Sequence, residues 1–315
     1  MKPRISLILP VYNTERFINR CLDSIINQTF RDIEIIIVND ATPDNAMDIV
    51  KKYSLSDTRF VIVNKTNNEG LMKARQTGYQ IAQGDYIVFC DTDDFLDLKA
   101  LEILYETIVS ENADIVMSGY KYVEVEGKIT EKIYSLPFGN DRLGVYRALL
   151  EDVIPHMLWG NIYKRELFTD YTYSCFMNQT NGEDFVLFYE IVNHVSKVAL
   201  TNKSIYYYCQ NSESSSQIRL SDDALRKWVF VDNHWFLYMR SLGIFLESVN
   251  IKILHRTYSK LLYGYNSKII IEGLSSLNDL LSYQCLIKYL GFLRGIDMFL
   301  LCKYGVYKLF RCRKR

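Results

Sequence analysis

The chain has 315 residues, of which 49% are hydrophobic and 23% are charged, and its formal net charge is zero. This composition is that of an ordinary globular protein and excludes a disordered or collagen-like chain. A neutral balance gives no reason to expect nucleic acid as the main partner. The seven cysteines are odd in number and show no C-x-x-C spacing. They argue against a disulfide framework or a zinc site and favour a reducing cytosol.

Strand and helix signals alternate through the first 122 residues. Short apolar runs predict strands, and apolar residues at helical spacing predict helices between them. The expected strands are Ile5–Leu9, Glu34–Val38, Phe60–Val63, Tyr86–Cys90 and Ile115–Tyr122, and the expected helices are Arg16–Asn27, Asp44–Tyr53, Leu71–Ala82 and Leu98–Val109. Strands this apolar, alternating with helices, predict an α/β fold with a Rossmann-like, mostly parallel central sheet covered by helices on both faces.

The pattern becomes less regular after residue 122. A hairpin is expected around Gly127, a helix over Glu183–His194, short strands at Val198–Leu200 and Ile205–Tyr208, and helices over Asp222–Met239, Val249–Ile271 and Leu277–Tyr289. We therefore expect one domain over 1–220, with a nucleotide-binding part at 1–122 and an acceptor-side part at 123–220. A helical C-terminal region over 221–315 would follow it.

The end of this helical region differs in charge from the rest of the chain. Residues 281–315 carry eight basic side chains and one acidic side chain, interleaved with aromatic residues. Cationic-aromatic segments adsorb to anionic membranes. The alternative is a pair of docked helices with a solvated basic end. The sequence thus leaves open whether this tail makes a peripheral membrane contact.

The sequence also contains no segment that predicts membrane insertion. An uninterrupted apolar run of about 18 residues, the length of a membrane span, is missing. The first apolar run ends at Pro10, which is too early for a signal peptide. We expect a cytoplasmic protein, with contact at the inner face of the cell membrane left open.

Three carboxylates follow the fourth expected strand, at Asp91, Asp93 and Asp94. In parallel sheets, ligands bind beyond the carboxyl ends of the strands, and Asn13 and Asp40 follow two neighbouring strands. Three carboxylates within four residues repel one another unless a cation is present, and oxygen ligands of this kind suit Mg²⁺ or Mn²⁺. The alternative is that Asp93 or Asp94 caps the next helix.

Two common nucleotide-binding motifs are missing from the sequence. There is no G-x-x-x-x-G-K-[ST] loop, which argues against a P-loop ATPase. The first strand does not lead into G-x-G-x-x-G, which disfavours a Rossmann dinucleotide site.

Several fragments, taken in order and spacing, resemble the family 2 glycosyltransferases. They are Ser6–Asn13, Val38–Asp40, Asn68–Gly70, Ala74–Arg75, Gly78 and Gly84–Asp94, followed more loosely by Trp159–Phe168, Gly182–Asp184 and Tyr206–Ser216. The resemblance implies a GT-A fold, a nucleotide-diphosphate sugar donor, a divalent cation (Mn²⁺ or Mg²⁺) and inversion at the anomeric carbon.

The resemblance also implies roles for individual residues on the donor side. By their positions in the family pattern, the residues that would line the nucleoside pocket are Pro10, Val11, Tyr12, Asn13 and Asp40. Arg75 would approach the base or a phosphate. Asp91 and Thr92 would contact ribose and diphosphate, and Asp93, together with Asp91, would hold the metal.

Glycosyl transfer also needs a base that takes the proton of the acceptor hydroxyl. Glu183 and Asp184 open an expected helix, whose dipole helps to keep a carboxylate ionised. Sequence alone does not separate this role from an ordinary acidic helix start, but position in the family favours Asp184 as the base and Glu183 as a neighbour that contacts a sugar. Trp159 and Tyr206–Tyr208 are expected to stack on sugar or to pack in the core, with Tyr207 pointing opposite to its neighbours.

The sequence therefore predicts a metal-assisted, inverting glycosyltransferase of the hexosyl- or N-acetylhexosaminyl-transferase class. It would move a sugar from a nucleotide-diphosphate donor, expected to be a UDP-sugar, to a hydroxyl of a glycan or lipid-linked acceptor in surface polysaccharide or oligosaccharide biosynthesis. One alternative is a non-catalytic sugar-nucleotide-binding or scaffold protein that retained the fold. Another is a nucleotidyltransferase, which would use a Gly-rich, basic first loop where this chain has Pro10–Asn13.

Overall fold

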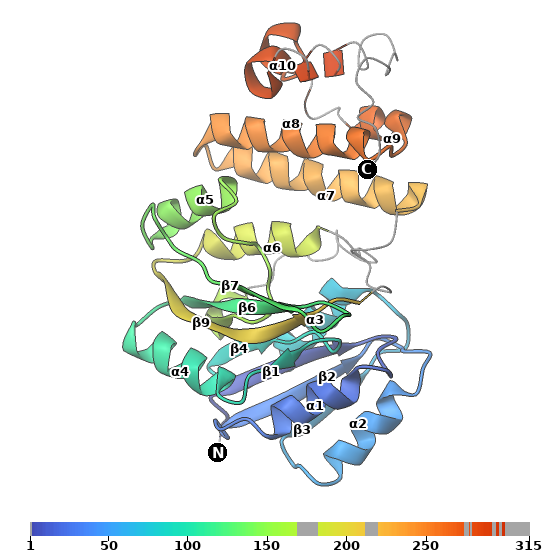
Figure 1. The fold of residues 1–315 in the computed structure, drawn as a ribbon, viewed down its shortest axis with the longest axis vertical. Coiled ribbons are helices and arrows are strands. Elements are labelled where there is room, and N and C mark those ends of the chain that lie inside the picture. Colours follow the sequence, from blue (N-terminus) through green and yellow to red (C-terminus); the bar gives the residue numbers. More distant parts are fainter. Residues whose placement is uncertain are drawn as a thin grey trace. The chain divides into compact units, whose positions relative to one another are not determined.

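The computed structural model describes residues 2–168, 182–211, 220–273, 277, 279–291, 294–295 and 298–299. The chain divides into two compact units, which we call unit 1 (1–218) and unit 2 (219–315). Unit 1 contains the sheet and the helices around it, and the described part of unit 2 is helical (Figure 1).

Unit 1 is built on one nine-stranded sheet with the order β3-β2-β1-β4-β8-β6-β9-β5, and β7 pairs with β6 off this path. The strands are β1 (Ile5–Val11), β2 (Ile33–Asn39), β3 (Phe60–Asn64), β4 (Tyr86–Phe89), β5 (Phe95–Leu96), β6 (Ile115–Val123), β7 (Ile129–Lys132), β8 (Ile162–Lys164) and β9 (Val198–Cys209). The parallel pairs are β1 with β2, β2 with β3, β1 with β4 and β6 with β9.

The direction of β8 determines how β6 and β9 run relative to β4. This short strand is antiparallel to both β4 and β6, so β4 and β6 run in the same direction. The carboxyl ends of β1, β2, β4, β6 and β9 therefore all lie at one edge of the sheet, which we call the carboxyl edge. The prediction of an α/β fold with a mostly parallel sheet is confirmed.

Helices cover both faces of the sheet. They are α1 (Ile18–Ile26), α2 (Ala46–Ser54), α3 (Leu71–Ile81), α4 (Ala100–Ser110), α5 (Arg142–Leu150) and α6 (Glu183–Val192), with a short 3₁₀ turn, η1, at Arg165–Leu167. Leu7 and Leu9 of β1 belong to the core shared with α1, α2 and α4. Alternation along the strand turns Ile8 to the other face, where α3 packs. A Cβ atom on Gly78 of α3 would lie 2.4 Å from Ile8, so only glycine permits this close packing.

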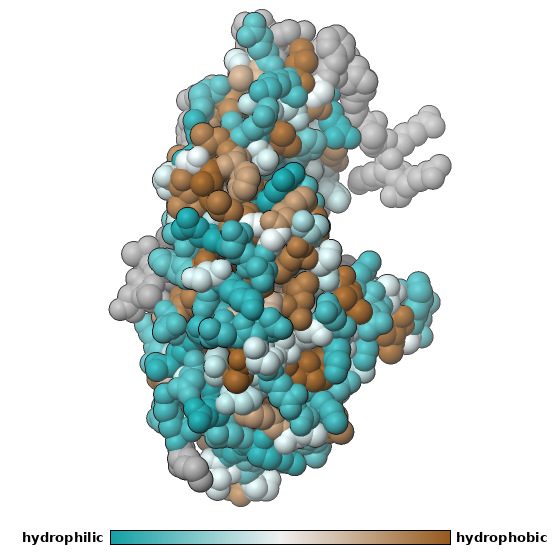
Figure 2. Space-filling view, turned by 90° about the vertical axis from the view of Figure 1, so that its left-hand side faces the viewer, coloured by the Kyte–Doolittle hydropathy of each residue, from teal (hydrophilic) through white to brown (hydrophobic). Residues whose placement is uncertain are grey.

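Unit 2 contains α7 (Asp222–Ser241), α8 (Leu246–Leu262), α9 (Ser267–Glu272) and α10 (Tyr283–Leu290). A cluster of charged side chains around the buried Asp232 joins α7 to α8. Asp232 of α7 accepts hydrogen bonds from Arg256, at 2.7 and 3.0 Å, and from Lys260, both on α8. Among the described residues, no helix has the length and apolar character needed to cross a membrane. Hydrophilic and hydrophobic patches alternate on the surface drawn in Figure 2.

The structure corrects four details of the predicted elements. The helix expected over Val249–Ile271 is two helices, α8 and α9, separated where Gly264 adopts a positive φ of 74°. The two short strands expected between residues 198 and 208 form a single strand, β9, with an irregular register against β6. The last expected helix begins only at Tyr283, and α5 was not predicted. Most of the basic segment 288–315 lies outside the described residues, so its membrane contact stays a prediction.

Candidate functional site at the carboxyl edge

The loop after β4 carries the acidic cluster, and Thr92 fixes it to the loop after β1. The buried Thr92 hydroxyl donates to the Pro10 carbonyl oxygen at 3.1 Å and lies 3.1 Å from the Thr14 hydroxyl. Of the residues predicted to line a nucleoside pocket, Pro10 and Val11 are the buried end of β1, and Tyr12 beyond them is exposed.

Asn13 follows Tyr12 with a left-handed backbone, at a φ of 56°. Its backbone N–H donates to the Thr42 hydroxyl at 2.7 Å. This bond joins the loop after β1 to the loop after β2, which carries Asp40. The predicted nucleoside-pocket residues thus come from neighbouring loops of the carboxyl edge.

Asp40 is buried, and its carboxylate is fully engaged with the start of α3. It accepts hydrogen bonds from Lys65 at 2.6 Å, from the backbone N–H of Glu69 at 3.1 Å and from that of Gly70 at 2.8 Å. Gly70 precedes the first residue of α3 and has a φ of 89°, a conformation that favours glycine. In this structure Asp40 therefore anchors the N-terminus of α3, and its predicted contact with a base stays a prediction.

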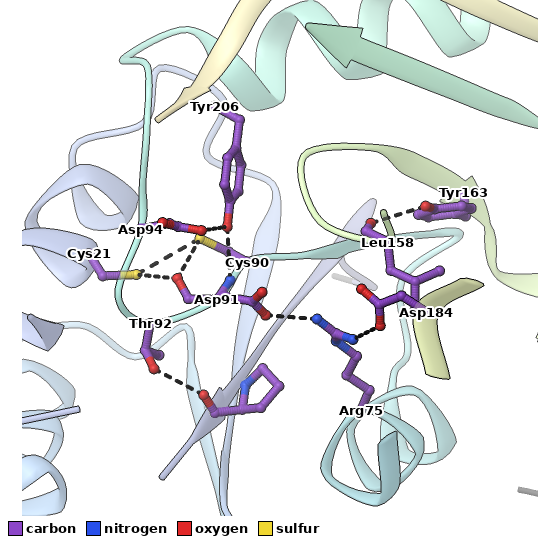
Figure 3. Close-up of polar contacts among 11 residues, drawn as sticks. Cys21, Arg75, Cys90, Asp91, Thr92, Asp94, Leu158, Tyr163, Asp184 and Tyr206 are labelled. Atoms are coloured by element: carbon purple, nitrogen blue, oxygen red, sulfur yellow. Dashed lines mark hydrogen bonds and ion pairs between the residues drawn. The ribbon is translucent and has the colours of Figure 1, made fainter. Parts of the chain in front are cut away.

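Arg75 of α3 joins the two parts of the predicted site. Its guanidinium donates to the Asp91 carboxylate at 2.9 Å and to the Asp184 carboxylate (Figure 3). The Arg75 residue is only 1% exposed, whereas the side chains of Asp91 and Asp184 each keep 23% of their surface exposed. One buried cation thus holds two partly open carboxylates that lie 93 positions apart in the sequence.

Asp184 is placed by the start of α6. Gly182 precedes the helix with a left-handed backbone, and the helix dipole favours an ionised carboxylate in the first turn. Burial raises the pKa of Asp184, while Arg75 and a hydrogen bond with the backbone of Leu158 act in the opposite direction. The Leu158 carbonyl oxygen is itself fixed by the Tyr163 hydroxyl at 3.0 Å (Figure 3). The side chain of Glu183 lies outside the described parts of the chain.

Asp93 and Asp94 have different surroundings, and neither caps a helix. Helix α4 begins at Ala100 after Lys99, so the capping alternative is wrong. The Asp93 carboxylate accepts from Asn211 at 3.2 Å, and burial, followed by the nearby charge of Asp91, raises its pKa.

Asp94 is buried and accepts from the Tyr206 hydroxyl at 2.7 Å and from the backbone N–H of Cys209 at 2.8 Å. Burial, followed by the charge of Asp93, raises the pKa of Asp94 well above its ordinary value. The Tyr206 hydroxyl also accepts from the backbone N–H of Asp91 at 3.1 Å. The sequence did not predict that Tyr206 supports this loop. The only signal was the alternation along β9, which places Tyr206 and Tyr207 on opposite faces.

Asp91 and Asp93 are the described carboxylates that best fit a divalent cation. Burial, followed by the charge of Asp91, raises the pKa of Asp93, and a bound cation would favour the ionised form of both carboxylates. Hard oxygen donors suit Mg²⁺ and Mn²⁺, and Mg²⁺ commonly takes one or two carboxylates and completes its shell with water and phosphate. No group of three His, Cys, Asp or Glu side chains within the described ranges could form a metal site from protein alone.

Comparison with known proteins places this chain in an enzyme class. A profile of glycosyl transferase family 2 matches residues 6–172, more than half of the chain. The glycosyltransferase GlyA of Streptococcus pneumoniae is 34% identical over 230 residues, which are 68% of this chain and 32% of that protein. The poly(ribitol-phosphate) beta-glucosyltransferase of Bacillus spizizenii is 37% identical over 127 residues, which are 39% of this chain and 20% of that protein. This chain thus matches less than a third of the length of either relative.

Solved structures agree on the fold. The crystal structure of S. aureus TarS 1–349 in complex with UDP-GlcNAc has a TM-score of 0.72 to this chain at 18% identity, over 96% of this chain and 91% of that one. The fold is therefore of the GT-A type with C-terminal helices, as predicted. This chain belongs to glycosyltransferase family 2.

Proposed function

We propose that this glycosyltransferase moves a sugar, with inversion, from a nucleotide-diphosphate donor to a hydroxyl group of a glycan or lipid-linked acceptor. The observation that carries the proposal is the bridge from Asp91 through Arg75 to Asp184. It puts the loop expected to hold the diphosphate beside the carboxylate expected to act as base. An inverting transfer needs these two functions on opposite sides of one sugar.

On the donor side, Asp91 and Asp93 would hold Mn²⁺ or Mg²⁺ together with the diphosphate. When bound, such a cation neutralises the negative charge that develops on the leaving diphosphate. Thr92 keeps the acidic loop against Pro10 and so fixes the distance from this loop to the end of β1. The TarS crystal that shares this fold contains UDP-GlcNAc, which supports a UDP-sugar as donor.

On the acceptor side, Asp184 would take the proton from the attacking hydroxyl. A base works best when its pKa approaches the working pH, and burial raises the pKa of Asp184 in this direction. Arg75 keeps the carboxylate oriented and opposes its protonation at rest. Glu183 would contact a sugar beside it.

A surface polysaccharide or oligosaccharide is the proposed product class. The relative from Bacillus spizizenii acts, by its name, on a poly(ribitol-phosphate) chain, which supports a polymeric acceptor rich in hydroxyl groups. A cytoplasmic location, with the basic segment after residue 288 at the inner face of the membrane, agrees with a lipid-linked acceptor.

A screen of nucleotide sugars tests the proposal. Purified protein would be mixed with UDP-, GDP- and TDP-sugars in the presence of Mn²⁺, Mg²⁺ or EDTA, and thermal shift and nucleotide release would be recorded. We expect one UDP-sugar to stabilise the protein and to release UDP slowly in the presence of a cation. Stabilisation by a sugar nucleotide without any turnover, with or without glycan acceptors, would instead support the non-catalytic alternative.

A further inference from the structure

A group of aromatic side chains lies at the carboxyl edge, beside the site described above. We call it the aromatic platform, and its members are Tyr120, Tyr122, Tyr134, Trp159 and Tyr208. Tyr120 and Tyr122 come from the end of β6, and they pair in register with Tyr206 and Tyr208 at the end of β9. Because β6 and β9 run parallel to β4, these rings lie at the same edge as the acidic loop.

Trp159 is the ring that connects the platform to the reacting groups. Its ring stacks on Tyr206 with a centroid distance of 4.4 Å and an interplanar angle of 22°, and the Tyr206 hydroxyl binds the backbone of Asp91. The preceding residue, Leu158, supplies the backbone contact to the Asp184 carboxylate. Trp159 is therefore linked, through Tyr206 and Leu158, to the two residues whose carboxylates Arg75 bridges.

The other rings extend from Trp159 as a continuous surface. Tyr208 stacks on Trp159 at 5.2 Å and 18°, and Tyr122 lies 5.7 Å from Tyr208. Tyr120 meets Trp159 edge-on at 5.4 Å and lies 6.3 Å from Tyr134. The platform consists of aromatic rings and hydroxyl groups and contains no charged side chain. An uncharged pyranose ring could stack on such rings and form hydrogen bonds with such hydroxyl groups.

The platform packs on the hydrophobic core through Tyr120, Trp159 and Tyr208 but is more exposed than the core itself. Tyr206 beneath it is fully buried, whereas all five members of the platform are only half-buried. In addition, the hydroxyl groups of Tyr120 and Tyr134 interact with one another, and burial raises the pKa of both. Binding sites for small ligands commonly combine aromatic walls with a few polar groups of this kind.

We infer that the aromatic platform binds a pyranose ring of the acceptor by stacking and holds the attacking hydroxyl toward Asp184. This inference rests on the proposed function, because it assigns the acceptor to one side of the same site. The nucleoside of the donor is predicted to bind at the loops after β1 and β2, at Pro10–Asn13 and Asp40. The platform is therefore a separate subsite with its own ligand.

The test uses three uncharged probes, the methyl β-glycosides of glucose, galactose and N-acetylglucosamine. Their binding to the full chain, in the presence of UDP and Mn²⁺, would be measured by saturation-transfer NMR with irradiation of the aromatic protons. UDP binding would be measured on the same samples. The variants are Trp159→Leu, Trp159→Phe and Tyr122→Leu, with Tyr207→Leu as the matched control.

Tyr207 is a suitable control because it lies on the same strand but on the opposite face. Its ring stacks on Phe95 at 4.3 Å and 11°. We expect at least one glycoside to bind the unmodified protein and to bind about tenfold more weakly to Trp159→Leu and Tyr122→Leu. Trp159→Phe, which keeps a ring, and Tyr207→Leu should bind it nearly as well as the unmodified protein.

Three results would overturn the inference. The first is no binding of any glycoside to protein that binds UDP. The second is unchanged glycoside binding in Trp159→Leu and Tyr122→Leu. The third is loss of UDP affinity in these variants, which would make the platform part of the donor site. If Trp159→Leu fails to fold, the comparison of Tyr122→Leu with Tyr207→Leu still decides the question. Failure of the unmodified protein to bind UDP at all would count against the proposed function instead.

Discussion

Each unit contains a cluster of charged side chains around a buried residue, Arg75 in unit 1 and Asp232 in unit 2, and the two clusters are balanced in opposite ways. At the carboxyl edge of unit 1, Asp91 and Asp184 share Arg75, while Asp93 and Asp94 add further acidic groups nearby. Acids outnumber bases in the described part of this cluster. The pKa values of Asp93, Asp94 and Asp184 are raised, with burial as the largest cause.

The cluster of unit 2 has the reverse balance. One carboxylate, Asp232, faces two cations, Arg256 and Lys260. Burial alone would raise the pKa of Asp232, but the two cations outweigh it and the pKa is lowered. This carboxylate is neutralised from within the unit, so the cluster joins two helices and requires no ligand. In unit 1 the carboxylates outnumber the cations beside them at a partly open edge, which is the arrangement that a bound cation and diphosphate would complete.

The largest expected effect is a loss of turnover on replacing Asp184, which belongs to the cluster of unit 1. Asp184→Asn keeps the size of the side chain but cannot take a proton. We expect turnover to fall by about 10³-fold with UDP affinity nearly unchanged, since general base catalysis supplies factors of this order. Steady-state kinetics and calorimetric titration with UDP would measure the two quantities. Turnover within a factor of three of the unmodified enzyme would remove Asp184 from the role of base.

The second prediction concerns stability in unit 2. Asp232→Ala leaves the buried Lys260 and the partly exposed Arg256 without their shared carboxylate, and it should destabilise unit 2 by about 3 kcal/mol. Denaturant unfolding can be followed by tryptophan fluorescence, because Trp228 and Trp235 both lie in α7. The matched control is Asp223→Ala on the same helix.

Asp223 is 76% exposed and pairs across one helical turn with Lys227. Its removal should leave the unfolding midpoint nearly unchanged, because exposed pairs of this kind contribute little. Equal effects of the two substitutions would mean that the buried cluster does not stabilise unit 2.

A smaller effect is expected when Arg75 is replaced by lysine. Lysine keeps the positive charge but lacks the planar fork that allows Arg75 to bind Asp91 and Asp184 at once. We expect turnover to fall by roughly 30-fold, about 2 kcal/mol of barrier, with the protein still folded. If Arg75→Lys turned over normally, the bridge would not position the base.

The fourth prediction follows from the pKa of Asp94, which is raised by burial. A carboxylate whose pKa is raised in the folded state prefers the protonated form there, so the stability of unit 1 falls as pH rises above the ordinary Asp pKa. Asp94→Asn is permanently neutral and retains an oxygen for the Cys209 N–H. The melting temperature of this variant relative to the unmodified protein should therefore rise by a few degrees between pH 4 and pH 7. A constant difference across this range would contradict the assignment.

Asp232 should behave with the opposite sign. Its pKa is lowered in the folded state, so it stabilises unit 2 above the ordinary Asp pKa and loses this contribution as pH falls through its own pKa. Acid should thus weaken unit 2, whereas rising pH should weaken the Asp94 region of unit 1.

Much of the fold could be predicted from sequence because the buried parallel strands are continuous apolar runs. Ile5–Val11 and Ile33–Asn39 are buried along almost their whole length, and their boundaries were predicted within two residues. The helical region was harder, because all its segments have similar helical spacing. A turn with a positive φ at Gly264 divides α8 from α9, and an ordinary glycine within an apolar pattern does not reveal it.

The candidate site could likewise be predicted only in part. The types and spacing of Asp91, Asp93 and Asp184 predicted acidic groups at the carboxyl edge, where the structure has them. The bridge made by Arg75 and the support given by Tyr206 could not be predicted. They depend on contacts across 109 and 112 positions, respectively, which local pattern does not encode.

The most direct test of the central claim is the dependence of UDP affinity on a divalent cation. The account holds that a bound divalent cation completes the acidic cluster of unit 1. Titration calorimetry should then show that UDP binds at least tenfold more tightly with Mn²⁺ than with EDTA. The Asp93→Asn substitution should abolish this difference. Equal UDP affinity with Mn²⁺ and with EDTA in the unmodified protein would contradict the account.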